Sequence, residues 1–257
     1  MGESIFNKFR LDGKVSIVTG ASRGLGRAIA AALAEAGSDV VVTARSEGAL
    51  EETAAAIREH GRRALAAPCN VHDGKSVATM VERTMAEFGQ VDILINNAGG
   101  GDMKPLVEMT EEEWLRIVDL NVNSMFRMCK AVGPHMIARR RGRVINMSSM
   151  YGLVGEKNVA AYCAGKGAIL QLTRALALEW AEYNITVNAL APGYIYTERT
   201  SRVFDNPDLS AMFTSRVPLG RIGRPEELGP LVIYMASDAS EFMTGSVIVI
   251  DGGQTAT

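Results

Sequence analysis

Short apolar runs alternate with longer helical patterns along the whole chain, and this alternation restricts the fold more than any other feature. The runs are rich in β-branched residues and predict strands at 15–19, 40–43, 63–67, 93–95, 144–147, 185–189 and 247–250. The helical periodicity between them predicts helices at 24–36, 48–60, 75–88, 111–139, 160–183 and 225–237. Apolar strands separated by helices form a parallel sheet that is buried on both faces. The sequence therefore predicts a doubly wound α/β fold with about seven strands.

The chain offers no internal repeat or low-complexity linker at which to divide it, so we expect a single domain over residues 1–257. Its least regular part, 194–224, follows the sixth predicted strand and mixes prolines and glycines with large apolar residues. Connections this long within a compact domain are usually functional. We expect a substrate lid here, and the alternative is an excursion that stays packed.

Charge and composition exclude several kinds of partner. The 27 basic and 29 acidic side chains leave a net charge of -2, which gives no overall field to attract nucleic acid. No apolar run approaches the ~18 to 20 residues that span a bilayer. The three cysteines and three histidines are scattered without metal-ligand spacing, so no metal site is expected. We expect a soluble, cytoplasmic protein with a small-molecule substrate and neither nucleic-acid nor membrane partners.

A glycine-rich turn directly follows the first predicted strand and opens the first helix. Glycines at such a turn let the backbone approach a pyrophosphate, whose charge is held by the free amides of the helix N-terminus. The segment reads Thr19-Gly20-Ala21-Ser22-Arg23-Gly24-Leu25-Gly26. This placement between strand and helix predicts a dinucleotide site.

The choice of dinucleotide depends on the end of the second predicted strand. An acidic residue there would accept a hydrogen bond from the ribose 2′-OH of NAD, whereas this chain has Ala44 followed by Arg45. Arg45 and Arg23 together predict two guanidinium groups on a 2′-phosphate. We therefore expect NADP(H), and the alternative for Arg45 is a solvated loop residue.

Tyr162 and Lys166 are four residues apart in one predicted helix, so their side chains share a face. An ammonium group beside a phenol favours the phenolate, which predicts a lowered pKa for Tyr162 and a role as proton donor. Taken alone, the pair is also compatible with a surface tyrosine packed on a lysine stem.

With these motifs the chain resembles the short-chain dehydrogenase/reductase family, from about Leu11 to Gly253. The matching motifs occur in the family's order: the glycine turn, Asn96-Asn97-Ala98-Gly99, Asn121, Ser149, Tyr162 with Lys166, and Pro192-Gly193. The resemblance implies a Rossmann fold and an NADP(H)-dependent oxidoreductase acting on a carbonyl or secondary alcohol.

The resemblance also implies roles for four catalytic residues. Ser149 would bind the substrate carbonyl, and the family's spacing of thirteen residues before the tyrosine selects it over Ser148. Tyr162 would donate the proton as hydride arrives, Lys166 would lower the tyrosine pKa and hold the ribose hydroxyls, and Asn121 would anchor a water that links the lysine to solvent.

The implied cofactor residues lie along the strand ends. One departs from the family pattern: Asn70 stands before Val71 where the family usually has an aspartate near the adenine. The full set is Gly20, Ser22, Arg23, Gly24, Leu25, Gly26, Arg45, Asn70, Val71, Asn97, Ala98, Gly99, Tyr162, Lys166, Pro192, Gly193 and Ile195.

The substrate is less well specified. We expect Ser149, Tyr151, Tyr162 and Tyr194 to bind it, within a pocket of apolar walls and a few polar tips. Further candidates for the wall are Met103, Met150, Glu156, Tyr196, Phe204 and Met212. Two subfamilies are similar to this chain, the gluconate 5-dehydrogenase-like enzymes and the 3-oxoacyl-(acyl-carrier-protein) reductases. We expect a small keto or polyol/sugar-acid substrate, with a 3-oxoacyl thioester as the alternative.

Three further expectations concern partners. The basic run Arg139-Arg140-Arg141-Gly142-Arg143 suits either an acidic carrier protein or a helix C-terminus. Carrier-protein reductases typically have a second basic docking residue where this chain has Tyr183. A non-catalytic NADP(H)-binding regulator is a third function class, but such proteins usually lose the tyrosine or the lysine. Apolar surface on the predicted helices 111–139 and 160–183, together with the family resemblance, implies a homotetramer.

Overall fold

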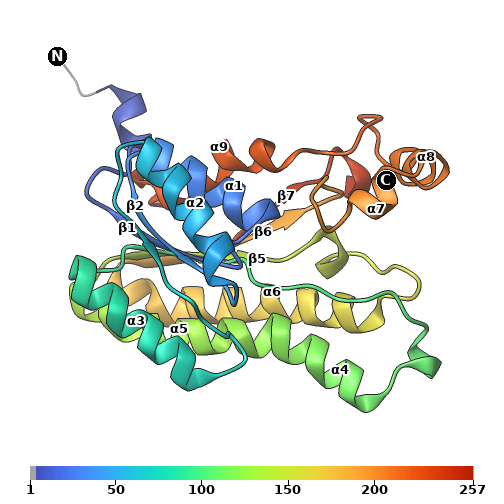
Figure 1. The fold of residues 1–257 in the computed structure, drawn as a ribbon, viewed down its shortest axis with the longest axis horizontal. Helices are drawn as coiled ribbons and strands as arrows, with labels where there is room; N and C mark the ends of the chain where they lie inside the picture. Colours follow the sequence, from blue (N-terminus) through green and yellow to red (C-terminus); the bar gives the residue numbers. More distant parts are fainter. Residues whose placement is uncertain (1–3, 257) are drawn as a thin grey trace.

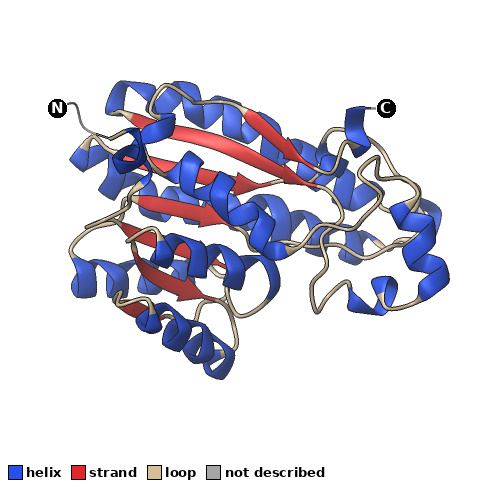
Figure 2. Ribbon diagram, turned by 90° about the horizontal axis from the view of Figure 1, so that it is seen from above, coloured by secondary structure: helices blue, strands red, loops and turns tan. Residues whose placement is uncertain are grey.

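The seven strands found within residues 4–256 lie in one parallel sheet, with the order β3-β2-β1-β4-β5-β6-β7. The computed structural model describes residues 4–256; residues 1–3 and 257, which the predicted domain includes, lie outside the described residues. The strands are β1 (Val15–Thr19), β2 (Asp39–Thr43), β3 (Ala64–Ala66), β4 (Ile93–Asn96), β5 (Gly142–Met147), β6 (Ile185–Pro192) and β7 (Val247–Ile250). The predicted doubly wound α/β fold is confirmed (Figures 1 and 2).

Helices cover both faces of this sheet. They are α1 (Gly24–Glu35), α2 (Glu47–Glu59), α3 (Gly74–Phe88), α4 (Glu111–Val118), α5 (Ser124–Arg139), α6 (Ala160–Trp180), α7 (Ser201–Phe204), α8 (Pro207–Thr214) and α9 (Gly229–Ala236). Figure 1 shows α1, α2 and α9 on one face, and α3, α5 and α6 on the other. None of the helices within residues 4–256 is long and apolar enough to cross a membrane.

Two apolar cores separate the layers because successive strand residues point to opposite faces. In β1, Val18 belongs to the core shared with α1, α2 and α9, whereas Ile17 belongs to the core shared with α3, α5 and α6. The strands in the middle of the sheet are therefore apolar on both faces. β7 lies at the edge of the sheet and is only partly buried.

The predicted helix at 111–139 is interrupted, which corrects the sequence prediction. A π-helical segment, Asp119–Asn123, separates α4 from α5. Within it the Asn121 side-chain amide donates to the carbonyls of Ile117 and Gly100, at 2.8 and 2.6 Å. A side chain that inserts into the helical ladder is a common cause of such a bulge, and bulges of this kind are frequent at functional sites.

The segment 194–224 is more regular than predicted, since it contains α7 and α8. Its two ends are held together where Tyr196 donates its amide to Gly223 O at 2.8 Å and Gly223 donates its amide to Tyr194 O at 2.9 Å. The segment therefore begins and ends at the same place on the domain. In Figure 2 it lies beyond the carboxyl ends of the strands.

The strand order reverses between β1 and β4, because β2 follows on one side of β1 and β4 lies on the other. The loops after these two strands diverge, and in open α/β sheets ligands bind in the crevice that results. The sheet thus places the ends of β1, β4, β5 and β6 around one crevice, with the segment 194–224 beyond it.

Candidate active site

A cavity of about 1210 Å³ opens at the carboxyl ends of the strands. Apart from the wall candidate Tyr196, every residue that the sequence analysis assigned to cofactor or substrate binding lines it, Ser149, Tyr162 and Lys166 included. Asn121 does not line it; this residue is buried behind Gly100. The structure therefore brings the predicted residues together, from the glycine turn at one end of the cavity to Tyr162 at the other.

The glycine turn approaches its neighbours too closely for a side chain. A Cβ on Gly26 would lie 2.3 Å from Gly20 O and 2.7 Å from Asn97 Nδ2. Gly20 and Gly24 have φ of +66° and +54°, which only glycine adopts without strain. Arg23 caps α1 without a side-chain hydrogen bond, so the amides of the first turn remain available to an anion. This cradle fits the pyrophosphate of a dinucleotide.

Arg23 and Arg45 lie exposed at this end of the cavity, beside Ala44. Neither guanidinium makes a hydrogen bond or ion pair with any residue in 4–256. Arg27 differs, since it donates to Ser22 O and pairs with Glu52 at 3.1 Å. Arg23 and Arg45 are thus available to bind a phosphate at the expected position of the ribose.

The expected adenine segment is tied to α5. Arg127 donates to Val71 O at 3.3 Å and to Asp119 at 2.7 Å, and His72 Nδ1 lies 2.5 Å from the same carboxylate. Burial alone would raise the pKa of Asp119, but hydrogen bonds from Arg127, Asn123 and His72 lower it to about 2. The charged Asp119 carboxylate therefore fixes the side chain of His72, and Arg127 fixes the backbone of Val71.

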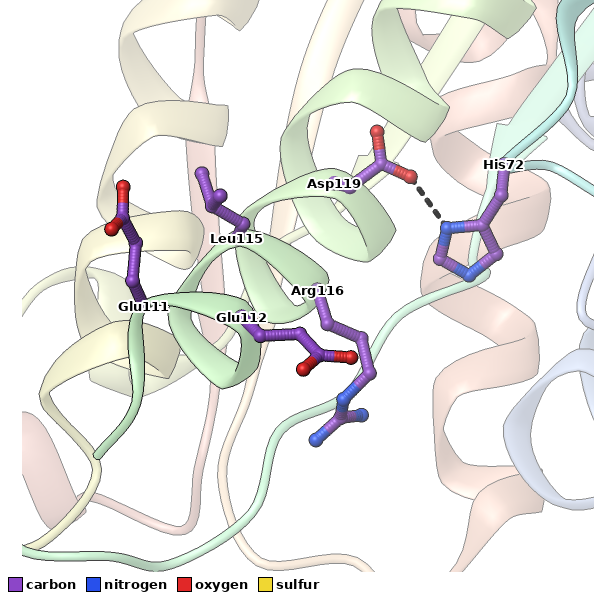
Figure 3. Close-up of a pocket in the computed structure, with 6 residues that line it drawn as sticks. All are labelled: His72, Glu111, Glu112, Leu115, Arg116 and Asp119. Atoms are coloured by element: carbon purple, nitrogen blue, oxygen red, sulfur yellow. Dashed lines mark hydrogen bonds and ion pairs between the residues drawn. The ribbon is translucent and has the colours of Figure 1, made fainter. Parts of the chain in front are cut away.

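A second, open cavity of about 540 Å³ lies beside this contact, and Figure 3 shows the residues that line it. It is lined by His72, Glu111, Glu112, Leu115, Arg116 and Asp119. His72 and Arg116 line both cavities, but the glycine turn, Ser149, Tyr162 and Lys166 all line the larger one. The smaller hollow is thus distinct from the candidate active site.

At the other end of the larger cavity, Tyr162 lies between Ser149 and Lys166. The Ser149 hydroxyl lies close enough to the Tyr162 phenol to lower the pKa of that phenol. The neighbouring Ser148 instead donates to the Lys166 carbonyl at 2.9 Å, within the core. Lys166 Nζ donates to Met147 O at 2.7 Å and lies 5.5 Å from the centre of the Tyr162 ring. The geometry is consistent with the choice of Ser149 that the family spacing gave.

The pKa values of Tyr162 and Lys166 differ from the expectation. Burial raises the pKa of Tyr162, while the Ser149 hydroxyl and the charge of Arg199 lower it. Lys166 itself is 4% exposed, and burial followed by the nearby Arg199 lowers its pKa to about 7. Lys166 is therefore only partly charged near neutral pH, which weakens its expected effect on the phenol.

This buried lysine predicts a pH dependence of stability. Its pKa is about 7 when folded and 10.5 in its reference state, so between these values the unfolded chain binds the additional proton. The free energy of unfolding therefore gains a contribution from Lys166 as pH rises from about 7 to about 10. Subtracting urea-unfolding free energies of a Lys166→Met variant from those of the unmodified protein at each pH isolates this contribution. A difference that stays constant with pH would contradict the burial of an ionisable amine.

Asn121 positions the loop that follows β4. Its side-chain oxygen accepts from Gly100 N at 3.1 Å, while its amide donates back to Gly100 O. A Cβ on Gly99 would lie 2.9 Å from Asn121 Oδ1 and 3.0 Å from Lys166 Nζ. Asn121 and Lys166 therefore both lie against Gly99. The expected water between Asn121 and Lys166 stays a prediction.

The expected substrate end of the cavity is aromatic. The Tyr151 and Tyr194 hydroxyls are 2.8 Å apart, and Tyr194 packs edge-on against Phe213 at 5.0 Å between ring centres. Of the other predicted wall residues, Met103, Met150, Glu156, Phe204 and Met212 line the cavity. Tyr196 does not: it is 43% exposed and donates to Asp205 at 3.0 Å. Its placement in the wall was wrong, because its hydroxyl points to Asp205 on the exposed surface of the segment.

The sequence analysis missed two arginines of the segment 194–224 that also line the cavity. Arg199 donates to Gly101 O at 2.8 Å and to Gly99 O at 3.3 Å. Arg216 donates to Glu156 at 2.6 Å. Both connect this segment to loops on the body of the domain. The positive charge of Arg199 and Arg216 within a long connection was the sequence feature that could have identified them.

Three comparisons with known proteins agree with this geometry. The family described as enoyl-(acyl carrier protein) reductase matches residues 20–255. The chain is 40% identical to the 2-dehydro-3-deoxy-D-gluconate 5-dehydrogenase of Dickeya dadantii, over 97% of this chain and 98% of that protein. It is also 40% identical to the 3-oxoacyl-[acyl-carrier-protein] reductase of Escherichia coli, over 94% of this chain and 97% of that protein.

One solved structure is similar over nearly its whole length. It is a gluconate 5-dehydrogenase from Burkholderia cenocepacia in complex with NADP and tartrate, with a TM-score of 0.95. The two chains are 36% identical, and the match covers 99% of this chain and 100% of that one.

Proposed function

The chain belongs to the short-chain dehydrogenase/reductase family, and on this premise we propose that it transfers hydride between NADP(H) and a carbonyl or secondary alcohol. The observation that carries the proposal is one continuous cavity with a glycine cradle and two unpaired arginines at one end and Ser149, Tyr162 and Lys166 at the other. We propose a small keto or sugar-acid substrate, in line with the gluconate and 2-dehydro-3-deoxy-D-gluconate dehydrogenases to which the chain is similar.

The residues present fit this cofactor. The first turn of α1 and the glycine cradle would hold the pyrophosphate, Arg23 and Arg45 the 2′-phosphate, and Lys166 the nicotinamide ribose. The adenine would be bordered by Asn70 and Val71. The remaining length of the cofactor would be lined by Asn97, Ala98, Gly99, Pro192, Gly193 and Ile195. When bound, NADP(H) supplies or accepts the hydride.

Side chains of the protein would then bind the substrate oxygen and supply its proton. Ser149 and Tyr162 lie beside each other in the cavity wall, so a carbonyl oxygen bound between them would receive two hydrogen bonds. Tyr162 remains protonated near neutral pH because its pKa is raised, so it is able to donate its proton to the developing alkoxide. Lys166, whose pKa is about 7, is suited to return a proton from solvent to the tyrosine.

A second candidate function is the reduction of a 3-oxoacyl thioester, favoured by the likeness to the Escherichia coli carrier-protein reductase. The basic run 139–143, a candidate docking surface for a carrier protein, gives this function little support, because the arginines of the run pair with other residues of the chain. Arg139 pairs with Asp92 at 3.1 Å, while Arg141 and Arg143 both pair with Asp238, at 2.9 and 3.3 Å. We therefore rank the sugar-acid class first.

An absorbance assay of NADPH consumption tests the proposal. The panel spans keto acids, ketoses and acetoacetyl thioesters, and we expect NADPH-dependent reduction with the highest kcat/KM among the keto acids. Greatest activity with thioesters would favour the second candidate. NADPH binding without turnover of any carbonyl would instead indicate a regulator, although the retention of Tyr162 and Lys166 argues against that class.

We propose that the segment 194–224 is a lid that sets substrate choice. In the structure it is fixed by Arg199 on the Gly99–Gly101 backbone, by Arg216 on Glu156, and by the backbone pairing at its base. The pairs that hold it are exposed polar contacts, which open at low cost. Hydrogen exchange should therefore be fast across this segment in the apo protein and should slow markedly with NADPH. Equal protection in both states would identify a permanently packed excursion.

We also propose a cytoplasmic homotetramer. Large apolar side chains are exposed on neighbouring helices of one face, among them Leu115, Phe126 and Leu178, which is 82% exposed. A second partly exposed apolar surface lies on the edge strand β7, at Val249. Closed symmetric assemblies commonly cover two such surfaces. Light scattering at micromolar concentration should give four times the chain mass, and a monomer would contradict this assignment. Free thiols at Cys69 and Cys129 suit a reducing compartment.

A further inference from the structure

The lining of the larger cavity is far more cationic than the molecule as a whole. The chain has a net charge of -2, whereas eight cationic and two acidic side chains line the cavity. The cations are Arg23, Arg27, Arg45, Arg116, Lys157, Lys166, Arg199 and Arg216, and the acids are Glu156 and Glu198. The phosphates of the proposed cofactor would account for the positive charge at the glycine-turn end. The cations on the lid side, beyond Tyr162, have no such explanation.

Arg216 is the lid cation best placed for a ligand. Its Nη1 donates to Glu156 at 2.6 Å, and its guanidinium lies 5.8 Å from the centre of the Phe213 ring, which packs edge-on against Tyr194. The side chain is 44% exposed at the cavity wall. An arginine held on an aromatic ring, with nitrogens that remain accessible, is arranged to bind a carboxylate with two hydrogen bonds.

A pair of hydroxyls separates Arg216 from the catalytic tyrosine. Tyr194 packs against Phe213, over which Arg216 lies, and its hydroxyl is 2.8 Å from the hydroxyl of Tyr151. Tyr151 in turn packs edge-on against Tyr162, with 6.4 Å between ring centres. The charges of Arg216 and Glu156 act on the Tyr151 hydroxyl, whereas the cation that acts on Tyr162 is Arg199. The order along the wall is thus the proton donor, two hydroxyls, and then a guanidinium.

We propose that Arg216 binds the carboxylate of the substrate, that Tyr151 and Tyr194 contact the hydroxyls between, and that the reacting carbon lies several bonds from the carboxylate. This inference rests on the proposed function and specifies its substrate class: a hydroxy acid oxidised away from its acid end. A 2-oxo acid, with its carbonyl next to the carboxylate, fits this wall poorly.

Arg199, the other lid arginine, is less suited to this role. Both of its bonded nitrogens donate to backbone carbonyls, which are fixed parts of the loop after β4. Arg216 instead pairs with a carboxylate side chain, and a substrate carboxylate is able to take that place. Glu156 then acts as a competitor for Arg216 and repels an acidic substrate, which gives the two partners opposite effects on specificity.

A purely structural ion pair would behave differently. If the contact between Arg216 and Glu156 served only to hold the lid, removing either partner would weaken it equally. Loss of Arg216 and loss of Glu156 would then change the kinetics in the same direction, for charged and uncharged substrates alike.

The test compares Arg216→Gln and Glu156→Gln with the control Arg221→Gln. Arg221 lies in the same segment and pairs with Glu227 at 2.6 Å, but it does not line the cavity. The probes are aldonates, each paired with its uncharged aldonamide of the same carbon chain, oxidised with NADP+. NADPH affinity and melting temperature of each variant show whether it remains folded.

For Arg216→Gln we expect the ratio of kcat/KM for acid over amide to fall about tenfold or more, chiefly through KM for the acid. Glu156→Gln should raise the same ratio, and Arg221→Gln should leave it unchanged. A parallel fall of the ratio in the Arg216 and Glu156 variants, or no change in either, would overturn the role of Arg216. Turnover by the unmodified enzyme without preference for the acid would overturn the inference while leaving the proposed function intact. Absence of turnover with every carbonyl and alcohol would overturn both.

Discussion

A Tyr162→Phe variant should lose nearly all turnover while it still binds NADPH with close to the original affinity. The hydroxyl that this change removes lies beside Ser149 in the cavity wall, where a substrate oxygen would bind. Positioned acid catalysis contributes ~10² to 10⁴ in rate, so kcat should fall by at least about a hundredfold. Steady-state kinetics and NADPH fluorescence titration measure the two quantities separately.

Two further variants separate chemistry from structure. Tyr196→Phe removes a phenol from the same part of the chain but outside the cavity, so it should behave like the unmodified enzyme. Lys166→Ala should damage both kcat and NADPH affinity, since the amine lies against Gly99 as well as near Tyr162. If the Phe variant kept more than a few per cent of the original activity, another group would have to be the proton donor.

Replacing Arg45 with aspartate should remove the preference for NADPH over NADH. Arg45 makes no ion pair within residues 4–256, so the change breaks no internal contact. It removes a hydrogen bond to the 2′-phosphate and adds a repulsive charge, while an aspartate at this position accepts from the ribose hydroxyl of NADH. Each charge-assisted hydrogen bond is worth about 1.5–3 kcal/mol, so NADPH affinity should fall at least about tenfold.

Dissociation constants for both cofactors test this expectation. Arg83→Asp makes the same charge change on the exposed face of α3, away from the cavity, and should alter neither constant. Equal affinity of the unmodified protein for NADPH and NADH would contradict the assignment of Arg23 and Arg45.

The parts of the fold that could be predicted from the sequence are those set by local pattern. The apolar runs identified all seven strands, because a buried parallel strand has to be apolar on both faces. The glycine turn was also predictable, since its spacing reflects backbone contacts such as that of Gly26 with Gly20 O. Tyr162 and Lys166 were found because helical spacing fixes which side chains share a face.

The parts that were missed depend on contacts between distant residues. The π-helical segment arises because Asn121 bonds to Gly100, twenty-one residues earlier in the chain, which no helical period reveals. Helices α7 and α8 are too short to show clear periodicity, so their segment was predicted to be irregular. The pKa of Tyr162 was expected to fall but is raised, since the degree of burial is not visible in a motif. The contact of Arg216 with Glu156 spans sixty residues and depends on how the lid packs.

Isotope transfer tests the central claim most directly. NADPH labelled with deuterium at C4 of the nicotinamide, separately on each face, is incubated with the best carbonyl substrate of the panel, and the product is analysed by mass spectrometry and NMR. The proposed hydride transfer predicts that the label from one face appears on the carbinol carbon of the product, and that Tyr162→Phe suppresses its appearance. Product without deuterium from either face would contradict direct hydride transfer at this site.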